Sequence, residues 1–261
     1  MVYFIGIHYE LNIKKVYVTV LRRYRLCVRV VGQFQMAHGV NFISDVLRQI
    51  KKRIGSGKIV LSVGVPFDDV LKSTFNKKTR LSHREINRIK ERCLQRVWGV
   101  NACDFVVKIE QNRNTIDLWA ISQEQLQQWE STCECNQVTM ACVRPIEVVL
   151  RDKVPQKRNL NALISCRAGD RLCWCAGVGG VTLASGFCSA PGHDIVNHVS
   201  QSMGEDFIKK CHYYYCHKPL VQGRSFTSDR RHSLTCGSKE VSMRVDFIFS
   251  FLLARSACYA M

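Results

Sequence analysis

The sequence has no apolar run long enough to cross a membrane as a helix. Its longest mainly apolar stretch, VDFIFSFLLA at 245–254, is well short of the roughly 20 residues that a bilayer requires. The apolar start, 1–7, has no basic lead and is interrupted by His8 and Glu10, unlike a secretory signal. These absences predict a cytoplasmic protein.

Acidic residues are scarce relative to basic ones. The chain has 38 Lys and Arg against 21 Asp and Glu, which gives a formal net charge of +17. Such an excess attracts polyanions, which are either nucleic acids or the anionic face of a membrane. Basic residues cluster at 22–25, 48–53, 76–80 and 230–232. Charge alone does not choose between these partners, and an ordinary solvated surface explains the clusters equally well.

Signatures of nucleophilic and redox catalysis are missing as well. There is no Gly-x-Ser-x-Gly nucleophile elbow. The cysteine pairs at 133 and 135 and at 173 and 175 do not have the Cys-x-x-Cys spacing of thioredoxin-like sites. The 14 cysteines are expected to be reduced, because the chain is long and has no export signal. Most lie among apolar residues, where a thiol acts as a small apolar side chain.

One segment, CHYYYCH at 211–217, contains residue types that bind Zn²⁺. In a strand, Cys211 and His217 would face one side while His212 and Cys216 face the other, which separates the four ligands. The spacing also departs from that of zinc fingers. We predict a structural strand without metal, with metal binding as the alternative.

Hydrophobic periodicity organises the rest of the chain. The first part has strand patterns at 2–7, 15–21 and 26–34 around a basic turn, a helical pattern at 41–54 and a continuous apolar strand at 59–65. This predicts a β-β-β-α-β unit whose last strand is buried on both faces.

After residue 65 the pattern restarts and predicts a β-α-β-β-α-β module that extends to 144. Its two helices each begin with a capping box, Ser82 with Glu85 and Ser122 with Gln125, in which side chains satisfy the free amides of the first turn.

A helix with Pro145 in its first turn leads to a polar linker at 151–159. Beyond the linker we predict a hairpin, a third strand at 180–186, a helix near 193–203 and a strand at 211–217. A long polar loop and a closing buried helix, or a strand plus a helix, complete the chain.

This order of elements resembles that of a known family, and four segments carry the resemblance. They are GIHYELNIKKVYVTVL at 6–21, LSVGVPFDDVLKSTFNKKTRLSHREINRIKERCLQRVWGV at 61–100, IDLWAISQEQLQQW at 116–129 and TMACVRPIEVVL at 139–150. Over roughly residues 2–150 the chain is similar to the PilM/HofM proteins, which are actin-like proteins of bacterial type IV pilus and competence (DNA uptake) machinery. Residues beyond 150 match only in outline.

The resemblance implies an α/β (mixed α+β) chain with a bilobed actin-like, ribonuclease H-like fold. Residues 1–65, completed by 145–152, would form the first lobe, 66–144 the inserted β-α-β-β-α-β module and 153–261 a reduced second lobe. Proteins of this family lie under the inner membrane and hold the cytoplasmic N-terminal tail of a PilN or HofN protein. The basic surface would favour contact with anionic lipid, direct contact with nucleic acid is not expected, and homo-oligomerisation stays open.

Actin-like ATPases bind nucleotide between two hairpins whose glycines admit phosphate and whose acids hold Mg²⁺. Here His8 takes the place of the expected acid and Glu10 that of the expected glycine, and a carboxylate there would repel phosphate. In the second hairpin Asp170 fits ordinary turn chemistry. A third glycine-rich stretch, 177–186, lacks the ending of a P-loop.

We therefore expect no catalytic residues, no metal and no cofactor, with His8, Glu10 and Asp170 marking degenerate phosphate loops. The predicted function is a non-catalytic scaffold of the type IV pilus or competence platform, peripheral to the inner membrane, that binds a PilN/HofN-type tail. An active ATPase that uses ATP and Mg²⁺ is the first alternative, and a basic nucleic-acid-binding module is the second.

Overall fold

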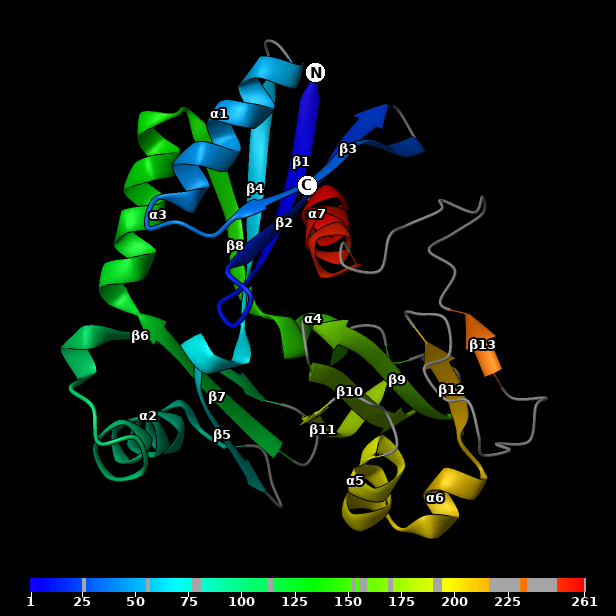
Figure 1. Ribbon diagram of the computed structural model, residues 1–261. Coiled ribbons are helices and arrows are strands. Elements are labelled where there is room, and N and C mark those ends of the chain that lie inside the picture. The colour runs from blue at the N-terminus through cyan, green and yellow to red at the C-terminus, as the bar shows by residue number, and fades with distance from the viewer. Residues whose placement is uncertain are drawn as a thin grey trace.

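The computed structural model describes residues 1–24, 27–54, 57–76, 81–111, 115–151, 154, 159–168, 171–189, 194–215, 231–233 and 248–260. Within these ranges the chain forms two five-stranded sheets and one three-stranded sheet. In Figure 1 the first sheet lies above, and the other two lie below it.

The first sheet is built around a central strand that is buried on both faces. Its strands are β1 (Val2–Glu10), β2 (Lys15–Tyr24), β3 (Cys27–Ala37), β4 (Lys58–Val65) and β8 (Val138–Pro145). Their order is β3-β2-β1-β4-β8. The first three strands form the predicted antiparallel meander, and β4 runs parallel to both β1 and β8.

The second sheet repeats this topology with the second half of the chain. Its strands are β9 (Asn161–Ala168), β10 (Arg171–Val178), β11 (Val181–Ser189), β12 (His212–Tyr215) and β13 (Arg231–Ser233). They are ordered β11-β10-β9-β12-β13, with an antiparallel meander followed by two parallel strands. Two copies of one sheet topology confirm the predicted bilobed, mixed α+β fold.

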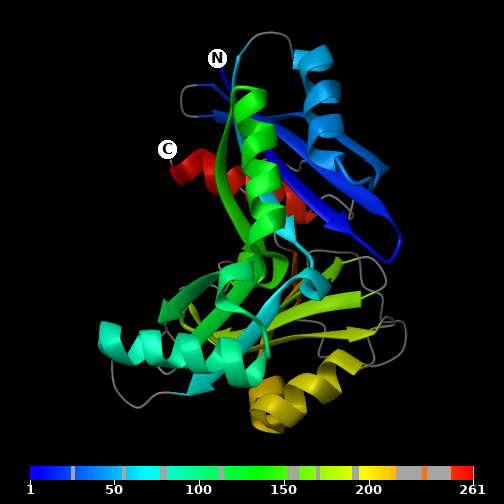
Figure 2. The same ribbon diagram turned by 90° about the vertical axis from the view of Figure 1, so that its left-hand side faces the viewer.

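Helices cover both faces of each large sheet (Figures 1 and 2). They are α1 (Phe42–Ile54), α3 (Gln123–Cys135), α4 (Ile146–Arg151), α5 (Asp194–Met203), α6 (Glu205–Lys209) and α7 (Ile248–Ala260). On the first sheet, α1 and α3 cover one face and α7 the other. On the second sheet, α4 packs on one face and α5 on the other. Helix α7 therefore returns to the first lobe, although its residues fall in the range expected for the second.

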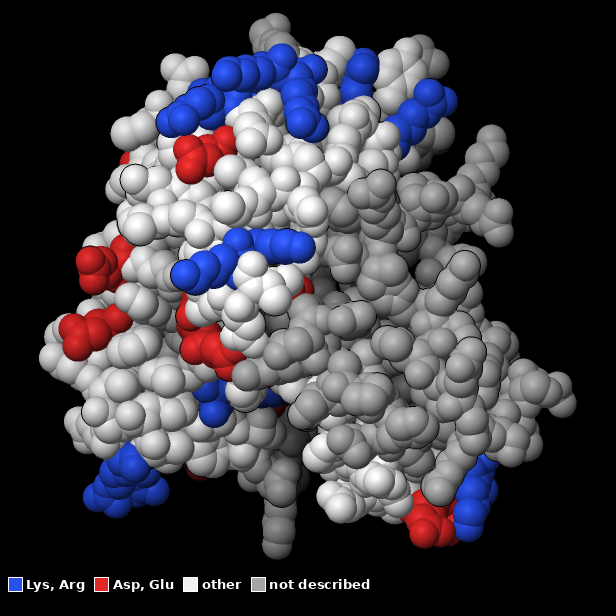
Figure 3. Space-filling view, viewed as in Figure 1, with Lys and Arg blue, Asp and Glu red and all other residues white. Residues whose placement is uncertain are grey.

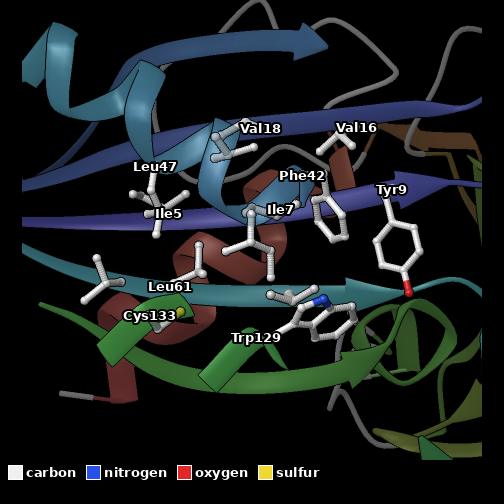
Figure 4. Close-up of a cluster of buried hydrophobic side chains, with 14 of the residues drawn as sticks. Ile5, Ile7, Tyr9, Val16, Val18, Phe42, Leu47, Leu61, Trp129 and Cys133 are labelled. Carbon is white, nitrogen blue, oxygen red and sulfur yellow. The ribbon is translucent and has the colours of Figure 1, made fainter. Parts of the chain in front are cut away.

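The main core lies between the first sheet and helices α1 and α3 (Figure 4). Alternation along β1 directs Ile5, Ile7 and Tyr9 to this side, where Leu47 of α1 and Trp129 of α3 close over them. All five side chains are buried, and burying each apolar side chain contributes about 1.5–3 kcal/mol. Helical and strand periodicity together thus fix which face of each element is inside.

The inserted unit has its own three-stranded sheet of order β5-β7-β6. Its elements are η1 (Phe67–Asp69), β5 (Leu71–Asn76), α2 (His83–Arg92), η2 (Cys93–Val97), η3 (Ala102–Asp104), β6 (Phe105–Gln111) and β7 (Thr115–Ser122). Helix α3 and strand β8, which we expected in this module, instead pack with α1 and pair with β4 in the first lobe.

Several local predictions need correction. The basic segment predicted as a turn begins inside a strand, since β2 continues to Tyr24. Pro145 ends β8 and precedes α4 instead of lying in its first turn. The Ser82 capping box forms in both directions, whereas only the Ser122 side chain acts at the start of α3. The helical spacing of Ile86, Ile89, Cys93 and Val97 also predicts Val97 on the inner side of its helix, but Val97 is exposed because the chain widens into a π-helical turn at η2.

Candidate functional site: the interface between the lobes

The first hairpin places His8 and Glu10 inside β1 and not in its turn. Their strand partners are Tyr17 and Lys15, and the turn itself comprises residues 11–14. Both side chains lie on the face of β1 opposite to Tyr9, the face that carries α7. A phosphate approaching this end of the sheet would meet these side chains, where an actin-like ATPase presents glycine backbone.

His8 is a neutral, buried ring. It is 1% exposed, and burial lowers its pKa to about 3. The imidazole stacks on Tyr17 with ring centroids 5.8 Å apart. Its Nε2 lies 3.8 Å from Glu10 Oε1, which is too far for a hydrogen bond. At neutral pH His8 therefore provides neither a positive charge for phosphate nor the carboxylate that would hold Mg²⁺.

Glu10 brings a carboxylate to the end of β1 with 8% of its surface exposed. A carboxylate and a phosphate at contact distance repel each other strongly where water is largely excluded. Among the described residues no group of three or more His, Cys, Asp or Glu side chains is arranged to hold a metal ion. The Glu10 carboxylate thus disfavours a phosphate at this hairpin, and neutral His8 offers Mg²⁺ no carboxylate there.

The second hairpin joins β9 to β10, and its last described pair is Ala168 with Arg171. Asp170, the third predicted site residue, lies outside the described residues. The glycine-rich stretch 177–186 forms a tight turn in which Gly179 and Gly180 have φ angles of 57° and 84°. Strand β11 follows this turn directly, so it does not offer the helix N-terminus that P-loops use to bind phosphate.

A buried polar network joins the two lobes and the inserted unit. Glu147 of α4 accepts hydrogen bonds from Lys72 of β5 and from Ser185 of β11. Glu147 is only 3% exposed. The Glu147 carboxylate of α4 thus bridges the inserted sheet and the second lobe.

A second ion pair lies beside the first. Arg151 at the end of α4 donates from Nη2 to Asp117 Oδ2 of β7 at 2.6 Å, and Thr74 Oγ1 donates to Asp117 Oδ1 at 2.7 Å. Burial alone would lower the pKa of Arg151, but the Asp117 carboxylate outweighs this effect and raises it. Arg151 therefore keeps its charge, and hydrogen bonds between buried side chains join α4 to the inserted unit.

Sequence patterns contain little sign of this network. Asp117 is a single acid in an apolar strand and Lys72 a single base in another, which is also what an ordinary solvated strand shows. Their partners are 34 and 75 residues away. Hydrophobic periodicity predicts which face a residue occupies but not its partner, so this pairing could not be derived.

An aromatic cluster marks the junction of the first lobe with η1. The Tyr9 hydroxyl donates to Asp69 Oδ2 at 2.7 Å and accepts from Gln125 Nε2 at 3.4 Å. Burial, reinforced by the Asp69 carboxylate, raises the pKa of Tyr9 far above its ordinary value, so the hydroxyl remains a donor. In the same segment the Phe67 ring packs at a tilt of 49° against Phe187 of the second lobe, with ring centroids 4.9 Å apart.

The cysteines of the two Cys-x-Cys pairs lie either in the core or at the surface. Cys173 and Cys175 are both fully buried in β10, as predicted. Burial raises the pKa of the Cys175 thiol to about 12, so it is a poor nucleophile at neutral pH. Cys133 and Cys135 lie at the end of α3, the first buried and the second exposed.

The predicted strand at 211–217 is present in part. Strand β12 covers His212–Tyr215, and Cys211 just before it is buried, which raises its pKa to about 12. Cys216 and His217, the other half of the alternative zinc site, lie outside the described residues.

Comparison with known proteins gives no match at the level of sequence: no protein-family model matches the chain, and no curated protein does. Among the described residues no helix is both long and apolar enough to span a bilayer.

Solved structures do match. The cytoplasmic domain of EpsL, an inner-membrane component of the type II secretion system of Vibrio cholerae, is similar over 99% of this chain and 95% of that one, with a TM-score of 0.61 and 11% identity. A chain of the PilM–PilN type IV pilus biogenesis complex is similar over 78% and 67%, with a TM-score of 0.51 and 9% identity.

A Bacteroides thetaiotaomicron protein with an actin-like ATPase fold and unknown function matches over 83% of this chain and 82% of its own, with a TM-score of 0.52 and 6% identity. At sequence identities this low, structural similarity establishes the fold alone. The chain has the actin-like fold that the resemblance to PilM implied.

Proposed function

We propose that this protein is a non-catalytic scaffold in the cytoplasm, peripheral to the bacterial inner membrane, in a platform of the type IV pilus, competence or type II secretion kind. We propose further that it binds the cytoplasmic N-terminal tail of a PilN/HofN-type membrane protein. The observation that carries the proposal is the correspondence of nearly the whole chain with a cytoplasmic domain from such a platform, together with the match to the PilM–PilN complex.

The chemistry of the lobe interface supports a scaffold and not an ATPase. Glu10 and neutral His8 occupy the first hairpin, where a nucleotide would need glycine backbone and a metal-binding acid. The ion pairs of α4 with β5 and β7 join the lobes by buried charges. Removing one partner of such a pair would leave a buried charge uncompensated at a cost of several kcal/mol, so both pairs depend on α4 staying packed against the inserted unit.

The junction of the first lobe with η1 is the surface that suits an apolar tail segment. The Lys14 carbonyl accepts a hydrogen bond from the His38 amide at 2.8 Å, which brings the β1–β2 turn against the loop before α1. Each of these loops exposes one branched apolar residue: Ile13 is 40% and Val40 85% exposed. Exposed apolar side chains on adjoining loops are typical of protein-binding surfaces.

A binding assay with the tail tests both the function and the site. We would measure fluorescence anisotropy of a labelled peptide that copies the N-terminal tail of the PilN-type protein encoded beside this chain. Saturable binding at micromolar concentrations is expected. Absence of binding at high micromolar protein would contradict the proposed function.

Matched variants locate the surface. Val40→Asp should weaken tail binding at least about tenfold, because burying an unpaired carboxylate costs more than 1.4 kcal/mol. Val97→Asp, which changes another exposed valine (59% exposed) in the inserted unit, should leave binding unchanged. Equal losses in both variants, or none in either, would place the tail elsewhere.

A further inference from the structure

A cavity of about 210 Å³ opens in the first lobe, between the last turns of α1 and the β2–β3 hairpin. It lies at the end of the lobe that points away from the second lobe, at the top of Figure 1. The residues that line it are Tyr3, Val20, Arg22, Val31, Gly32, Phe34, Ile50, Arg53 and Ile54. Two of these residues are arginines, none is acidic, and most of the others are apolar.

The backbone explains why the cavity exists. Alternation along β2 directs Val16, Val18 and Val20 toward α1, so Arg22 extends from the same face just beyond the core. Opposite it, the β2–β3 pairing shifts by one residue, so that Val20 pairs with Gly32 and Leu21 with Val30. The extra residue is Val31, and such a bulge bends the strand.

Glycine at position 32 leaves the cavity open. A Cβ added to Gly32 would come no closer than 4.0 Å to Val20 Cβ, which is ordinary van der Waals contact. The backbone there does not require glycine for a positive φ angle. A larger residue can therefore be placed at this position to fill the cavity.

The two arginines have unused hydrogen-bonding capacity. The Nε of Arg22 is buried and has no hydrogen-bond partner in the described part of the protein. The guanidinium of Arg53 lies over the ring of Phe34, 4.6 Å from its centroid, which leaves its N–H edges free. A buried unpaired donor is costly, and a guanidinium presents a planar fork that matches phosphate oxygens.

Further basic residues belong to elements at the same end of the first lobe. Lys51 and Lys52 belong to the last turn of α1, Lys58 begins β4, and Arg29 pairs with Arg22 across β2 and β3. Figure 3 shows Lys and Arg side chains gathered in a band along the top of the molecule. The described residues of two predicted basic clusters, 22–24 of the first and 48–53 of the second, therefore lie at one end of the first lobe.

Apolar side chains are exposed at the same end. Val31 is 47% and Tyr24 60% exposed, beside the basic band. Exposed aromatic and aliphatic groups among lysines and arginines are typical of surfaces that lie in the headgroup region of a membrane. A polynucleotide would use the charges but would have no use for the apolar walls of the cavity.

We propose that this cavity binds the phosphate of an anionic phospholipid headgroup, with Arg22 and Arg53 as its hydrogen-bond donors and Val20, Val31 and Ile50 against the glycerol and first acyl carbons. The first lobe would then face the membrane with the end opposite to the second lobe. This inference concerns a site distinct from the junction of Ile13 and Val40, so it can fail or succeed independently of tail binding.

Vesicle binding tests the proposal with variants that keep the charge. We would compare co-sedimentation with vesicles of phosphatidylcholine alone and of phosphatidylcholine mixed with phosphatidylglycerol, at physiological salt. Arg22→Lys combined with Arg53→Lys keeps the net charge but loses the forked donors, and binding to the anionic vesicles should fall about tenfold. Gly32→Leu, which fills the cavity, should cause a similar loss.

The matched control is Lys52→Gln, which removes a charge from the band without changing the cavity, and it should change binding about twofold or less. Thermal unfolding of each variant checks that it is folded. If the Arg-to-Lys pair binds anionic vesicles as well as the unchanged protein does, attraction is diffuse and the proposal is wrong.

A second measurement distinguishes the sources of the phosphate. The arginine Nε–H signals in a ¹⁵N spectrum would be followed on adding glycerol 1-phosphate, inorganic phosphate or a phosphate-free acidic peptide. A shift of the Arg22 signal with glycerol 1-phosphate at lower concentration than with inorganic phosphate supports a lipid headgroup. Equal or stronger response to inorganic phosphate or to the peptide overturns the assignment to lipid.

Discussion

Arg151 at the end of α4 and Asp117 in the middle of β7 form a buried ion pair 2.6 Å long. Their side chains are 9% and 4% exposed, so neither charge can be solvated well if its partner is removed. The pair ties the inserted unit to the helix that packs on the second lobe. Its loss should therefore affect the stability of the whole chain and not only of one loop.

We predict that Asp117→Ala lowers the free energy of unfolding by about 3–5 kcal/mol, because it leaves the Arg151 charge buried without a partner. Urea denaturation followed by circular dichroism measures the change. Glu205→Gln, which breaks an exposed pair with Lys209, is the control and should cost less than about 1 kcal/mol. Similar losses of unfolding free energy in both variants would mean that the buried pair contributes no more to stability than the exposed pair does.

The double variant Asp117→Leu with Arg151→Met separates charge from packing. Replacing both partners by apolar groups removes the uncompensated charge, so it should be less destabilised than Asp117→Ala alone. A double variant that is as unstable as the sum of its single changes would show that the two charges do not interact.

Gly6 of β1 allows α7 to pack directly on the first sheet. A Cβ at this position would lie 1.7 Å from the carbonyl oxygen of Ser250 and 2.7 Å from the amide nitrogen of Ala254. Both are backbone atoms, so the whole helix would have to move. We predict that Gly6→Ala lowers the free energy of unfolding by about 1–3 kcal/mol or more, measured by urea denaturation.

Gly39→Ala provides the comparison for Gly6. Nothing lies within 4 Å of the added Cβ at Gly39, and the residue does not need a positive φ angle. This substitution should be neutral or slightly stabilising, since alanine restricts the unfolded chain. Comparable destabilisation at both positions would argue against close packing of α7 on β1.

Sequence patterns predicted the strands and helices of the first lobe well, because each pattern depends on residues that are close together in the sequence. The alternation in β2 and the helical spacing of Phe42, Val46, Leu47 and Ile50 each fix a buried face within one element. The Ser82 capping box likewise depends on residues only three apart, and it forms as predicted.

The placement of elements relative to one another was harder to predict. Helix α7 packs on β1 and β2, more than 200 residues away in the sequence, and Thr19 Oγ1 of β2 lies 2.8 Å from Ser250 Oγ of α7. An apolar helix shows that it is buried but not which sheet buries it. The same limit applies to the bulge at Val31, which leaves no mark in the sequence and opens the cavity beside Arg22.

The side chains of His8 and Glu10 in the first hairpin argue against nucleotide binding. We predict that calorimetry shows no sub-millimolar binding of Mg²⁺-ATP to the unchanged protein, because Glu10 places a carboxylate where phosphate would have to lie. Submillimolar binding that is lost in Glu10→Ala would show that Glu10 holds the metal and would make the protein an active nucleotide-binding member of the fold. Glu10→Ala should not create ATP affinity, because neutral His8 still stands where the metal-binding acid would have to be.

Acidification should destabilise the protein through His8. Burial lowers the pKa of His8 from 6.5 to about 3 in the folded chain, so between these values the unfolded chain binds more protons than the folded one. The stability contribution is complete above pH 6.5 and is lost as the pH falls, by about 1.4 kcal/mol per pH unit. From pH 7 to pH 5 this amounts to about 2 kcal/mol.

The His8→Gln variant isolates this effect, because its side chain is polar but does not titrate. Burial also lowers the pKa of His38, but that residue and the carboxylates are common to both proteins and cancel in the comparison. Urea denaturation at pH 7 and pH 5 should therefore show a smaller loss of stability in the variant, by about 2 kcal/mol. Identical pH dependence of stability in the two proteins would contradict the prediction. It would mean that the folded protein keeps His8 solvated or charged. A charged His8 would place a positive group beside Glu10 at the phosphate end of β1.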